Sequence, residues 1–228
     1  MALPVFIQAR MSSKRLPGKV LQETRGKPLI AYLIERVRYC RNADSINLVT
    51  STDREDDPLA AFGEKAGIRV LRGPLDDVMG RFIVAATQIQ ARAFVRINGD
   101  SPLLDPRLID RGIAEYETAP VDLVSNAFPR SYPKGQGVEV ISVSALQAVA
   151  AEADSSAYRE HVAMFFYDHP ARFRIRNFSY GRDVSDIQLS VDTPEDLADF
   201  HAILDAMERP HTEYSLDDVL QLLRATPR

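Results

Sequence analysis

The chain has 228 residues, of which 45% are hydrophobic and 26% are charged. These fractions are typical of a folded globular protein and exclude wholesale disorder. The formal net charge of −4 argues against a protein that coats duplex nucleic acid, but a local basic cluster on an acidic chain can still bind a small anion. The single cysteine, Cys40, excludes an intrachain disulfide and suits a reducing cytoplasm.

The N-terminal segment and the apolar runs predict no contact with a membrane. Residues 1–7 contain no basic leader and no cleavage-site pattern, which argues against a signal peptide. No apolar run approaches the ~20 residues that span a bilayer. We therefore expect a cytoplasmic protein without nucleic-acid or membrane partners.

Strands and helices are predicted to alternate four times in the first half of the chain. This alternation is typical of βαβ units, so we expect an α/β fold of the Rossmann-like type, a mostly parallel twisted sheet with helices on both faces. The expected strands are 5–7, 46–50, 68–71 and 93–97, and the expected helices are 28–39, 58–66, 76–91 and 106–117.

The second half has a less regular pattern. The Pro- and Gly-rich segment 129–137 is too short for a domain linker, so we expect one domain over residues 1–228. The expected strands are 123–124, 138–141, 173–178 and 187–191, and the expected helices are 143–151, 158–167, 194–207 and 216–223.

A basic loop follows the first strand. Within ten residues it contains Arg10, Lys14, Arg15 and Lys19, with two hydroxyls and a glycine among them. Small residues let backbone N–H groups approach a ligand, and the cations neutralise it, which are the requirements of a polyphosphate site. Ligands of such sheets bind beyond the carboxyl ends of the strands, where this loop is expected. The alternative interpretation is a solvated basic loop.

The basic loop matches neither of two common phosphate-binding patterns. A Walker A loop needs a glycine and a Ser or Thr where this chain has Ser13 and Val20. The dinucleotide pattern G-x-G-x-x-G is also missing. Any phosphate site here therefore belongs to another class.

Two aspartates follow expected strands. Asp100 lies in a Gly-Asp-x-Pro turn, which presents one carboxylate over the sheet, and Mg²⁺ is usually held by one or two carboxylates with phosphate oxygens and waters. The alternative role for an aspartate in a turn is capping. Asp105, before Pro106, suits the cap of the next helix. For Asp192 the alternative stays open, because Asp192 or Thr193 could cap the helix that follows.

Four segments carry a resemblance to a known family. Residues 7–19, I-Q-A-R-M-S-S-K-R-L-P-G-K, resemble the I-Q-A-R-M-G-S-T-R-L-P-G-K signature of sugar nucleotidyltransferases, the CMP-Kdo and CMP-acylneuraminate synthetases, in the branch named for spore coat polysaccharide biosynthesis protein F. Residues 132–140 resemble P-x-G-x-D-V-E-V, with Gly137 in place of Asp. Residues 159–162 match R-E-H-V, and residues 191–197 match V-D-x-P-E-D-L.

The resemblance implies a nucleotide-diphospho-sugar transferase fold and a set of site residues. Residues 1–118 would form the nucleotide-binding half, and residues 119–228 the acceptor half and closing helices. Mg²⁺ would bind to Asp100 and Asp192. The implied catalytic residues are Arg10, Arg15, Lys19 and Asp100; the nucleotide-binding residues are Gln8, Ala9, Arg10, Met11, Ser12, Ser13, Arg15 and Lys19; and the acceptor-binding residues are Arg130, Lys134, Glu139, Arg159, Glu160 and His161.

The implied activity is nucleotidyl transfer for cell-surface or spore-coat polysaccharide synthesis. A sugar would react with a nucleoside triphosphate, CTP first among the candidates, to give a nucleotide sugar and pyrophosphate, and the related synthetases imply a homodimer. One alternative is a glycosyltransferase of similar fold, although the Asp-x-Asp usual there is missing. The other is a non-catalytic nucleotide-binding protein. For Glu160 and His161, the alternative is an ordinary helix face with a salt-bridged glutamate and a half-buried histidine.

Overall fold

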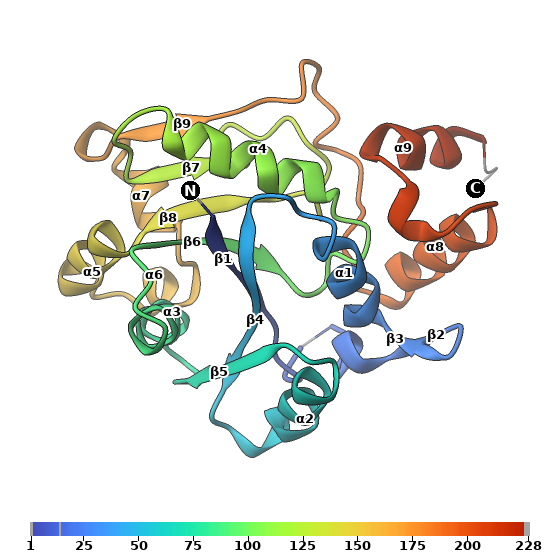
Figure 1. Ribbon diagram of the computed structural model, residues 1–228, viewed down its shortest axis with the longest axis horizontal. Coiled ribbons are helices and arrows are strands. Elements are labelled where there is room, and N and C mark those ends of the chain that lie inside the picture. The colour runs from blue at the N-terminus through green and yellow to red at the C-terminus, as the bar shows by residue number, and fades with distance from the viewer. Residues whose placement is uncertain (1, 14, 226–228) are drawn as a thin grey trace.

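The computed structural model describes residues 2–13 and 15–225, and its centre is a seven-stranded sheet (Figure 1). The strand order is β5-β4-β1-β6-β8-β7-β9. These strands are β1 (Leu3–Gln8), β4 (Ala43–Ser51), β5 (Arg69–Gly73), β6 (Ala93–Asn98), β7 (Leu123–Ser125), β8 (Glu139–Ser142) and β9 (Ile175–Asn177). The helices are α1 (Leu29–Val37), α2 (Asp57–Lys65), α3 (Val78–Gln88), α4 (Pro106–Glu117), α5 (Val143–Glu152), α6 (Ser156–Glu160), α7 (Met164–Asp168), α8 (Pro194–Asp205) and α9 (Leu216–Ala225).

The sheet is mostly parallel, as the sequence predicts. Strands β5, β4, β1 and β6 pair in parallel, β8 is antiparallel to both β6 and β7, and β9 is parallel to β7. The carboxyl ends of β1, β6 and β7 therefore share one edge of the sheet with the beginning of β8. Both halves of the chain contribute strands to this sheet.

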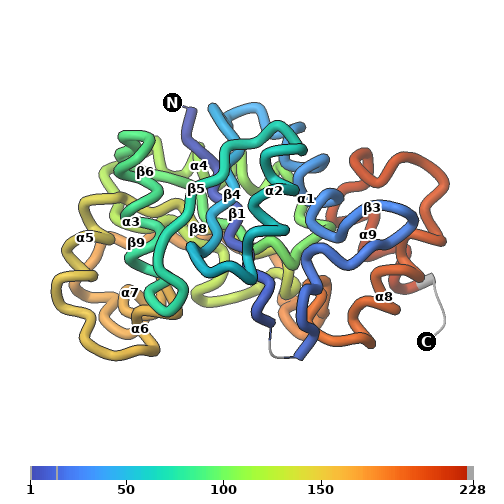
Figure 2. The backbone as a smooth tube through the Cα atoms, turned by 90° about the horizontal axis from the view of Figure 1, so that it is seen from below, coloured from blue at the N-terminus to red at the C-terminus, as the bar shows by residue number. Residues whose placement is uncertain are grey.

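Alternating side chains of the strands build two apolar layers, one on each face. Val5 and Ile7 pack in the first layer with residues of α1, α4, α8 and α9. Phe6 packs in the second layer with residues of α3, α5 and α7, and its ring lies 4.8 Å from that of Phe94. Figure 2 shows α3, α5, α6 and α7 at one end of the molecule and α8 and α9 at the other. This burial on both faces explains the continuous apolar run of residues 5–7 in β1.

A small hairpin, which the sequence analysis did not predict, connects the basic loop to α1. It consists of β2 (Glu23–Thr24) and β3 (Lys27–Pro28), with Gly26 at φ +77° in the turn. The Thr24 hydroxyl lies 2.9 Å from Nε2 of His201 on α8. The hairpin therefore links the basic loop to the C-terminal helices.

The predicted strand 187–191 is wrong. Gln188 forms only an isolated bridge with Lys134. The amide of Lys134 donates to the carbonyl of Ile187, and the amide of Leu189 donates to the carbonyl of Lys134. The hydrogen bonds of this apolar segment therefore go to a loop, and no adjacent strand is available to extend a ladder.

The predicted single helix over 158–167 is also wrong, because the structure has two short helices, α6 and α7, in its place. The backbone leaves the helical region at His161, where φ is −104° and ψ is 85°. The break buries Val162 and Ala163 in the second apolar layer and leaves Glu160 at the end of α6. The other predicted helices and strands are confirmed, with ends that differ by a few residues.

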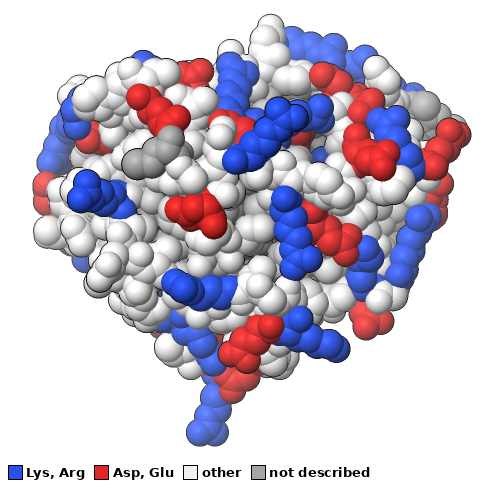
Figure 3. Space-filling view, in the orientation of Figure 1, with Lys and Arg blue, Asp and Glu red and all other residues white. Residues whose placement is uncertain are grey.

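Charges are mixed on the face shown in Figure 3, where basic and acidic side chains lie interspersed. Within residues 2–13 and 15–225, no helix is both long enough and apolar enough to cross a bilayer.

Candidate functional site

The basic loop leaves β1 and is held in a closed shape. The amides of Ser13 and Gly18 both donate to the carbonyl of Met11, at 2.9 Å. Gly18 has φ +69°, a left-handed conformation that suits glycine. The amide of Met11 donates to Asp56 Oδ1 at 2.6 Å, so the turn between β4 and α2 supports the loop. Nothing in the sequence pattern singled out Asp56.

Lys19 begins a 3-10 turn and directs its side chain across the site. Its Nζ atom donates to Asp100 Oδ2 and to Asp192 Oδ1, both at 2.8 Å. Only 8% of the Lys19 side chain is exposed, against 24% for each carboxylate. Arg15 contacts the same Asp192 Oδ1 atom at 2.9 Å, and its own side chain is largely exposed. Two cations and two carboxylates from three distant segments therefore meet.

Asp100 is placed by the close approach of β6 to β1. The amide of Gly99 donates to the carbonyl of Gln8 at 2.8 Å. A Cβ atom on Gly99 would lie 2.8 Å from the Cβ of Ala9, so only glycine fits. The cap of α4 is Asp105, which accepts from the amide of Arg107, and this leaves the Asp100 carboxylate to the site.

Asp192 is placed by a bond between the two aspartate segments. The amide of Val191 donates to the carbonyl of Asp100 at 2.8 Å. Thr193 caps α8 and forms a reciprocal capping box with Asp196, so the cap that the sequence left open belongs to Thr193. Burial raises the pKa of Asp192, but the Lys19 and Arg15 cations outweigh it and leave the pKa below its usual value. The carboxylate is therefore ionised at neutral pH.

These residues line a cavity of about 300 Å³ at the carboxyl end of the sheet. Met11 does not line it but packs against the first apolar layer, and Lys14 lies outside the described residues. Asn98 and Val20 line it without having been predicted, although Asn98 directly precedes the Gly-Asp turn. The predicted residues in its wall are Gln8, Ala9, Arg10, Ser12, Ser13, Arg15, Lys19, Asp100 and Asp192.

One predicted acceptor residue contacts a side chain of the cavity wall without lining the cavity itself. Glu160 accepts two hydrogen bonds from the Arg10 guanidinium, at 2.6 and 3.3 Å. Arg159 turns away, because its guanidinium donates to the carbonyl of Ala150 and lies 3.4 Å from Asp77. His161 is exposed at the end of α6. The ordinary helix face considered for Glu160 also expects a salt bridge, so the ion pair with Arg10 leaves both interpretations of Glu160 open, whereas the half-burial expected for His161 is not observed.

Glu139 lies behind the cavity wall and supports it. One of its carboxylate oxygens accepts from Arg96 at 2.5 Å, and the other accepts from the Tyr167 hydroxyl at 2.6 Å. Arg96 also donates to Gln8 Oε1 at 2.9 Å. A guanidinium has no acceptor atom, so the Gln8 amide must turn its oxygen to Arg96. Glu139 therefore orients Gln8 through Arg96.

Arg130 and Lys134 have exposed side chains on the loop between β7 and β8. The backbone of Lys134 bonds to the segment that leads to Asp192. Gly135 has φ +88°, and a Cβ atom there would lie 2.5 Å from the amide nitrogen of Ser190. This loop therefore supports the position of Asp192 from outside the cavity.

A larger open concavity of about 790 Å³ lies at the opposite edge, where the parallel strands begin. Residues 2–4, 44–47 and 89–93 line it. It lacks paired carboxylates and the basic loop, and ligands of such sheets bind at the carboxyl ends of strands. The smaller cavity is therefore the better candidate for chemistry.

Asp100 and Asp192 fit a divalent cation by their chemistry. Both carboxylates reach one point, since each lies 2.8 Å from the same Nζ atom. Among the described residues, no group of three or more His, Cys, Asp or Glu could hold a metal ion. Two carboxylates completed by phosphate oxygens suit Mg²⁺, which usually binds with substrate phosphates rather than in an all-protein cage.

The cytidylyltransferase family model matches residues 5–221. The chain belongs to the cytidylyltransferase family. The spore coat polysaccharide biosynthesis protein SpsF of Bacillus subtilis (strain 168) is 32% identical over 232 residues, which cover 97% of this chain and 94% of that protein.

Solved structures agree with this family. A cytidylyltransferase from Leptospira borgpetersenii serovar Hardjo-bovis superposes with a TM-score of 0.93 at 25% identity, over 99% of this chain and 94% of that one. CMP:2-keto-3-deoxy-manno-octonic acid synthetase complexed with CTP has a TM-score of 0.70 at 19% identity, over 90% of this chain and 99% of that one, and so shares the fold. Cytidylyltransferases transfer CMP from CTP and release pyrophosphate, which decides among the three alternatives in favour of a nucleotidyltransferase.

Proposed function

We propose that this cytidylyltransferase transfers CMP from CTP to a sugar, with a divalent cation, in the synthesis of a polysaccharide. The observation that carries the proposal is the joint contact of Lys19 with Asp100 and Asp192 at the wall of the cavity. The name of the Bacillus subtilis relative supports polysaccharide synthesis, and the name of the octonic acid synthetase supports an acidic sugar as acceptor.

The reaction is a displacement at phosphorus. A sugar hydroxyl oxygen forms a bond to the α-phosphorus of CTP, the bond from that phosphorus to the bridging oxygen of the β-phosphate breaks, and pyrophosphate leaves with this electron pair. The hydroxyl proton passes to solvent. Such reactions depend on positioning and charge neutralisation. Arg10, Arg15 and Lys19 would bind the phosphate oxygens and stabilise the charge on the leaving pyrophosphate.

Asp100 and Asp192 would hold Mg²⁺, which supplies charge neutralisation at the α-phosphate when bound. Arg15 and Lys19 lie against these carboxylates. The same cations would therefore exchange carboxylate partners for phosphate partners when CTP enters.

The acceptor would bind beside Arg10, on the side of the cavity where α6 ends. Glu160 is already joined to Arg10 there, and His161 follows it with an exposed side chain. Exposed Arg130 and Lys134 provide positive charge on the neighbouring loop for an acidic sugar. We assign nucleotide binding to residues 1–118 and acceptor binding to residues 119–228, with Asp192 as the contribution of the second half to the metal.

A thermal-shift panel tests the nucleotide assignment. CTP, GTP, ATP and UTP are each added with and without Mg²⁺, to the wild type and to D192N. A ligand at about 100 times its Kd stabilises the protein by about 2.7 kcal/mol, which raises the melting temperature by a few degrees. We expect CTP to raise the melting temperature of the wild type, and Mg²⁺ to increase this shift further. In D192N, Mg²⁺ should give no further increase. No shift with any triphosphate would contradict the proposal.

Pyrophosphate release tests the acceptor class. CTP, Mg²⁺ and the wild-type protein are combined with 3-deoxy-manno-octulosonate, with an acylneuraminate, or with neutral hexoses as the control. We expect release with an acidic sugar only. Release with the neutral hexoses alone would contradict the assignment of an acidic acceptor.

A further inference from the structure

The Nζ atom of Lys19 occupies the point that joins the two carboxylates. It lies 2.8 Å from Asp100 Oδ2 and 2.8 Å from Asp192 Oδ1, and the side chain is 8% exposed. An ammonium group has three donors and no acceptor, and two of the donors are used here. The lysine therefore satisfies one oxygen of each carboxylate.

A divalent cation held by both carboxylates would take the place of the ammonium at the point where they converge. Its preferred ligands are anionic oxygens. The described residues offer no cluster of three metal-binding side chains to which it could move. The cation and the ammonium also repel each other, so the carboxylate pair holds one or the other.

The formal charges of the four side chains in this cluster balance. Asp100 and Asp192 contribute −2, and Lys19 and Arg15, which both contact Asp192, contribute +2. A free cation therefore meets no net negative charge. A triphosphate changes this balance, because its oxygens can pair with Lys19 and Arg15 and release both carboxylates.

We propose that Lys19 excludes free divalent cations from Asp100 and Asp192, and so makes the site specific for a cation that enters with the nucleotide. The inference rests on the proposed function, since it takes the two carboxylates as the metal site. The flexible four-carbon stem lets Nζ move to a phosphate while the backbone stays in the turn Lys19–Leu21. Cation and nucleotide then bind with positive coupling, and each strengthens the other by the same factor.

Direct Mn²⁺ binding without nucleotide tests the inference. Calorimetry or the electron paramagnetic resonance signal of free Mn²⁺ gives the affinity of the wild type, K19M and K19R. We expect K19M to bind Mn²⁺ at least about tenfold more tightly than the wild type, within the usual range of coupling between sites, and K19R to match the wild type. K27M is the matched control, because Lys27 pairs with Glu35 on α1, and its affinity should not change.

The double variant K19M/D100N should lose the gain, which shows that the Mn²⁺ binds at the carboxylates. A K19M variant that binds Mn²⁺ no more tightly than the wild type would overturn the inference. Circular dichroism checks that K19M folds, and K19Q replaces it in the same measurement if it does not.

A second arm separates this inference from the proposed function. Mn²⁺ binding is measured with CTP present, in the wild type and in D100N. Mn²⁺ that is bound by CTP alone contributes equally to both measurements, so the difference between the two proteins reports the Mn²⁺ held by the protein site. If D100N binds as much Mn²⁺ as the wild type, the metal site of the proposed function is wrong. If the wild type binds more Mn²⁺ than D100N with CTP present, but K19M binds Mn²⁺ no more tightly than the wild type without CTP, only the role of Lys19 is wrong.

Discussion

The Lys19 side chain is buried, positively charged and long enough to contact two carboxylates. It contacts both carboxylates from beneath the basic loop, and its backbone follows Gly18, which has φ +69°. Neighbouring Arg15 has a largely exposed side chain, so solvent and salt weaken its pairing. The strongest single contribution to the binding of phosphate is therefore expected from Lys19.

Replacing Lys19 with Ala should lower turnover about a hundredfold, because the loss of one preorganised cation costs about 3 kcal/mol in the barrier. Steady-state pyrophosphate release measures this loss, and the far-UV circular dichroism spectrum should remain that of the wild type. K27A is the control, since Lys27 forms an ion pair outside the cavity. Wild-type turnover in K19A would contradict the phosphate role of the loop.

Gly135 shows how a residue outside the cavity can position a residue within it. Its φ is +88°, and a Cβ atom would lie 2.5 Å from the amide nitrogen of Ser190, two residues before Asp192. Replacing Gly135 with Ala should lower the free energy of unfolding by about 2 kcal/mol, through backbone strain and steric overlap. Urea denaturation measures this change, and the Mg²⁺-dependent part of the CTP thermal shift should decrease with it.

Gly137 provides the matched control for that experiment. Nothing lies within 4 Å of a Cβ atom built on it, and its φ is not positive. G137A should leave the free energy of unfolding nearly unchanged. Equal losses in both variants would show that the conformation of Gly135 has no special role.

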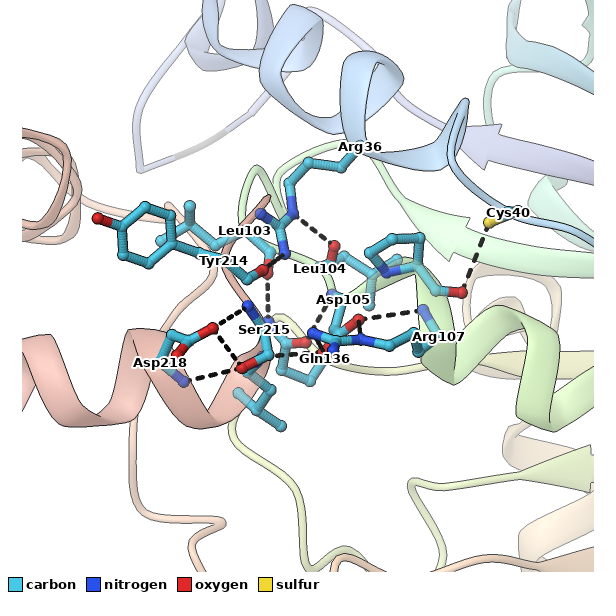
Figure 4. Close-up of polar contacts among 12 residues, drawn as sticks. Arg36, Cys40, Leu103, Leu104, Asp105, Arg107, Gln136, Tyr214, Ser215 and Asp218 are labelled. Atoms are coloured by element: carbon cyan, nitrogen blue, oxygen red, sulfur yellow. Dashed lines mark hydrogen bonds and ion pairs between the residues drawn. The ribbon is translucent and has the colours of Figure 1, made fainter. Parts of the chain in front are cut away.

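At the scale of elements, a buried arginine links α1 to the segment that precedes α9 and to the loop before α4 (Figure 4). Arg36 on α1 is fully buried and donates to the carbonyls of Leu104 at 2.8 Å, Tyr214 at 2.7 Å and His211. Burial lowers its pKa to about 10, so it remains charged at neutral pH. Asp105 adds a second link, because its Oδ2 atom accepts from the amide of Leu216.

Replacing Arg36 with Met should lower the free energy of unfolding by about 3 kcal/mol, because three carbonyl groups lose their buried partner. The control is R38M at the C-cap of the same helix, since the Arg38 side chain is exposed and its guanidinium donates to the carbonyl of Ala66. Urea denaturation compares the two variants. A loss in R36M no larger than that in R38M would contradict the anchoring role of Arg36.

Helices α6 and α7 show where periodicity fails as a guide. Apolar residues at helical spacing run through residues 158–167, so the pattern predicts one helix. The break at His161 satisfies two tertiary demands at once, burial of Val162 and the pairing of Glu160 with Arg10. Neither demand is visible in local sequence, because the partners of both residues are distant along the chain.

At the scale of the whole molecule, both halves share one sheet and both apolar layers. Val95 on β6 pairs with Val140 on β8 across the boundary between the halves. We therefore expect residues 1–118 and 119–228 to unfold in a single cooperative transition. Differential scanning calorimetry tests this, through equal calorimetric and van't Hoff enthalpies, and two separate transitions would contradict it.

The sequence by itself determined the α/β class, most helices and strands, the basic loop and the two aspartates. These features depend on local physics: period-two and period-3.6 apolar patterns, caps such as Asp105, and a concentration of cations directly after a strand. Signals of this kind can be recognised in the sequence because the residues that produce them lie close together along the chain.

Only the tertiary structure decided which groups meet. It assigned the cap of α8 to Thr193 and brought Asp192 to Lys19, placed Glu139 behind Arg96, and gave the segment 187–191 a loop as its partner. Apart from the Thr193 cap, which is a local contact with Asp196, each of these outcomes depends on a hydrogen bond or ion pair between residues far apart in the chain. Such contacts form because folding buries polar groups that must find partners, and the partner is chosen by the packing of the sheet and helices.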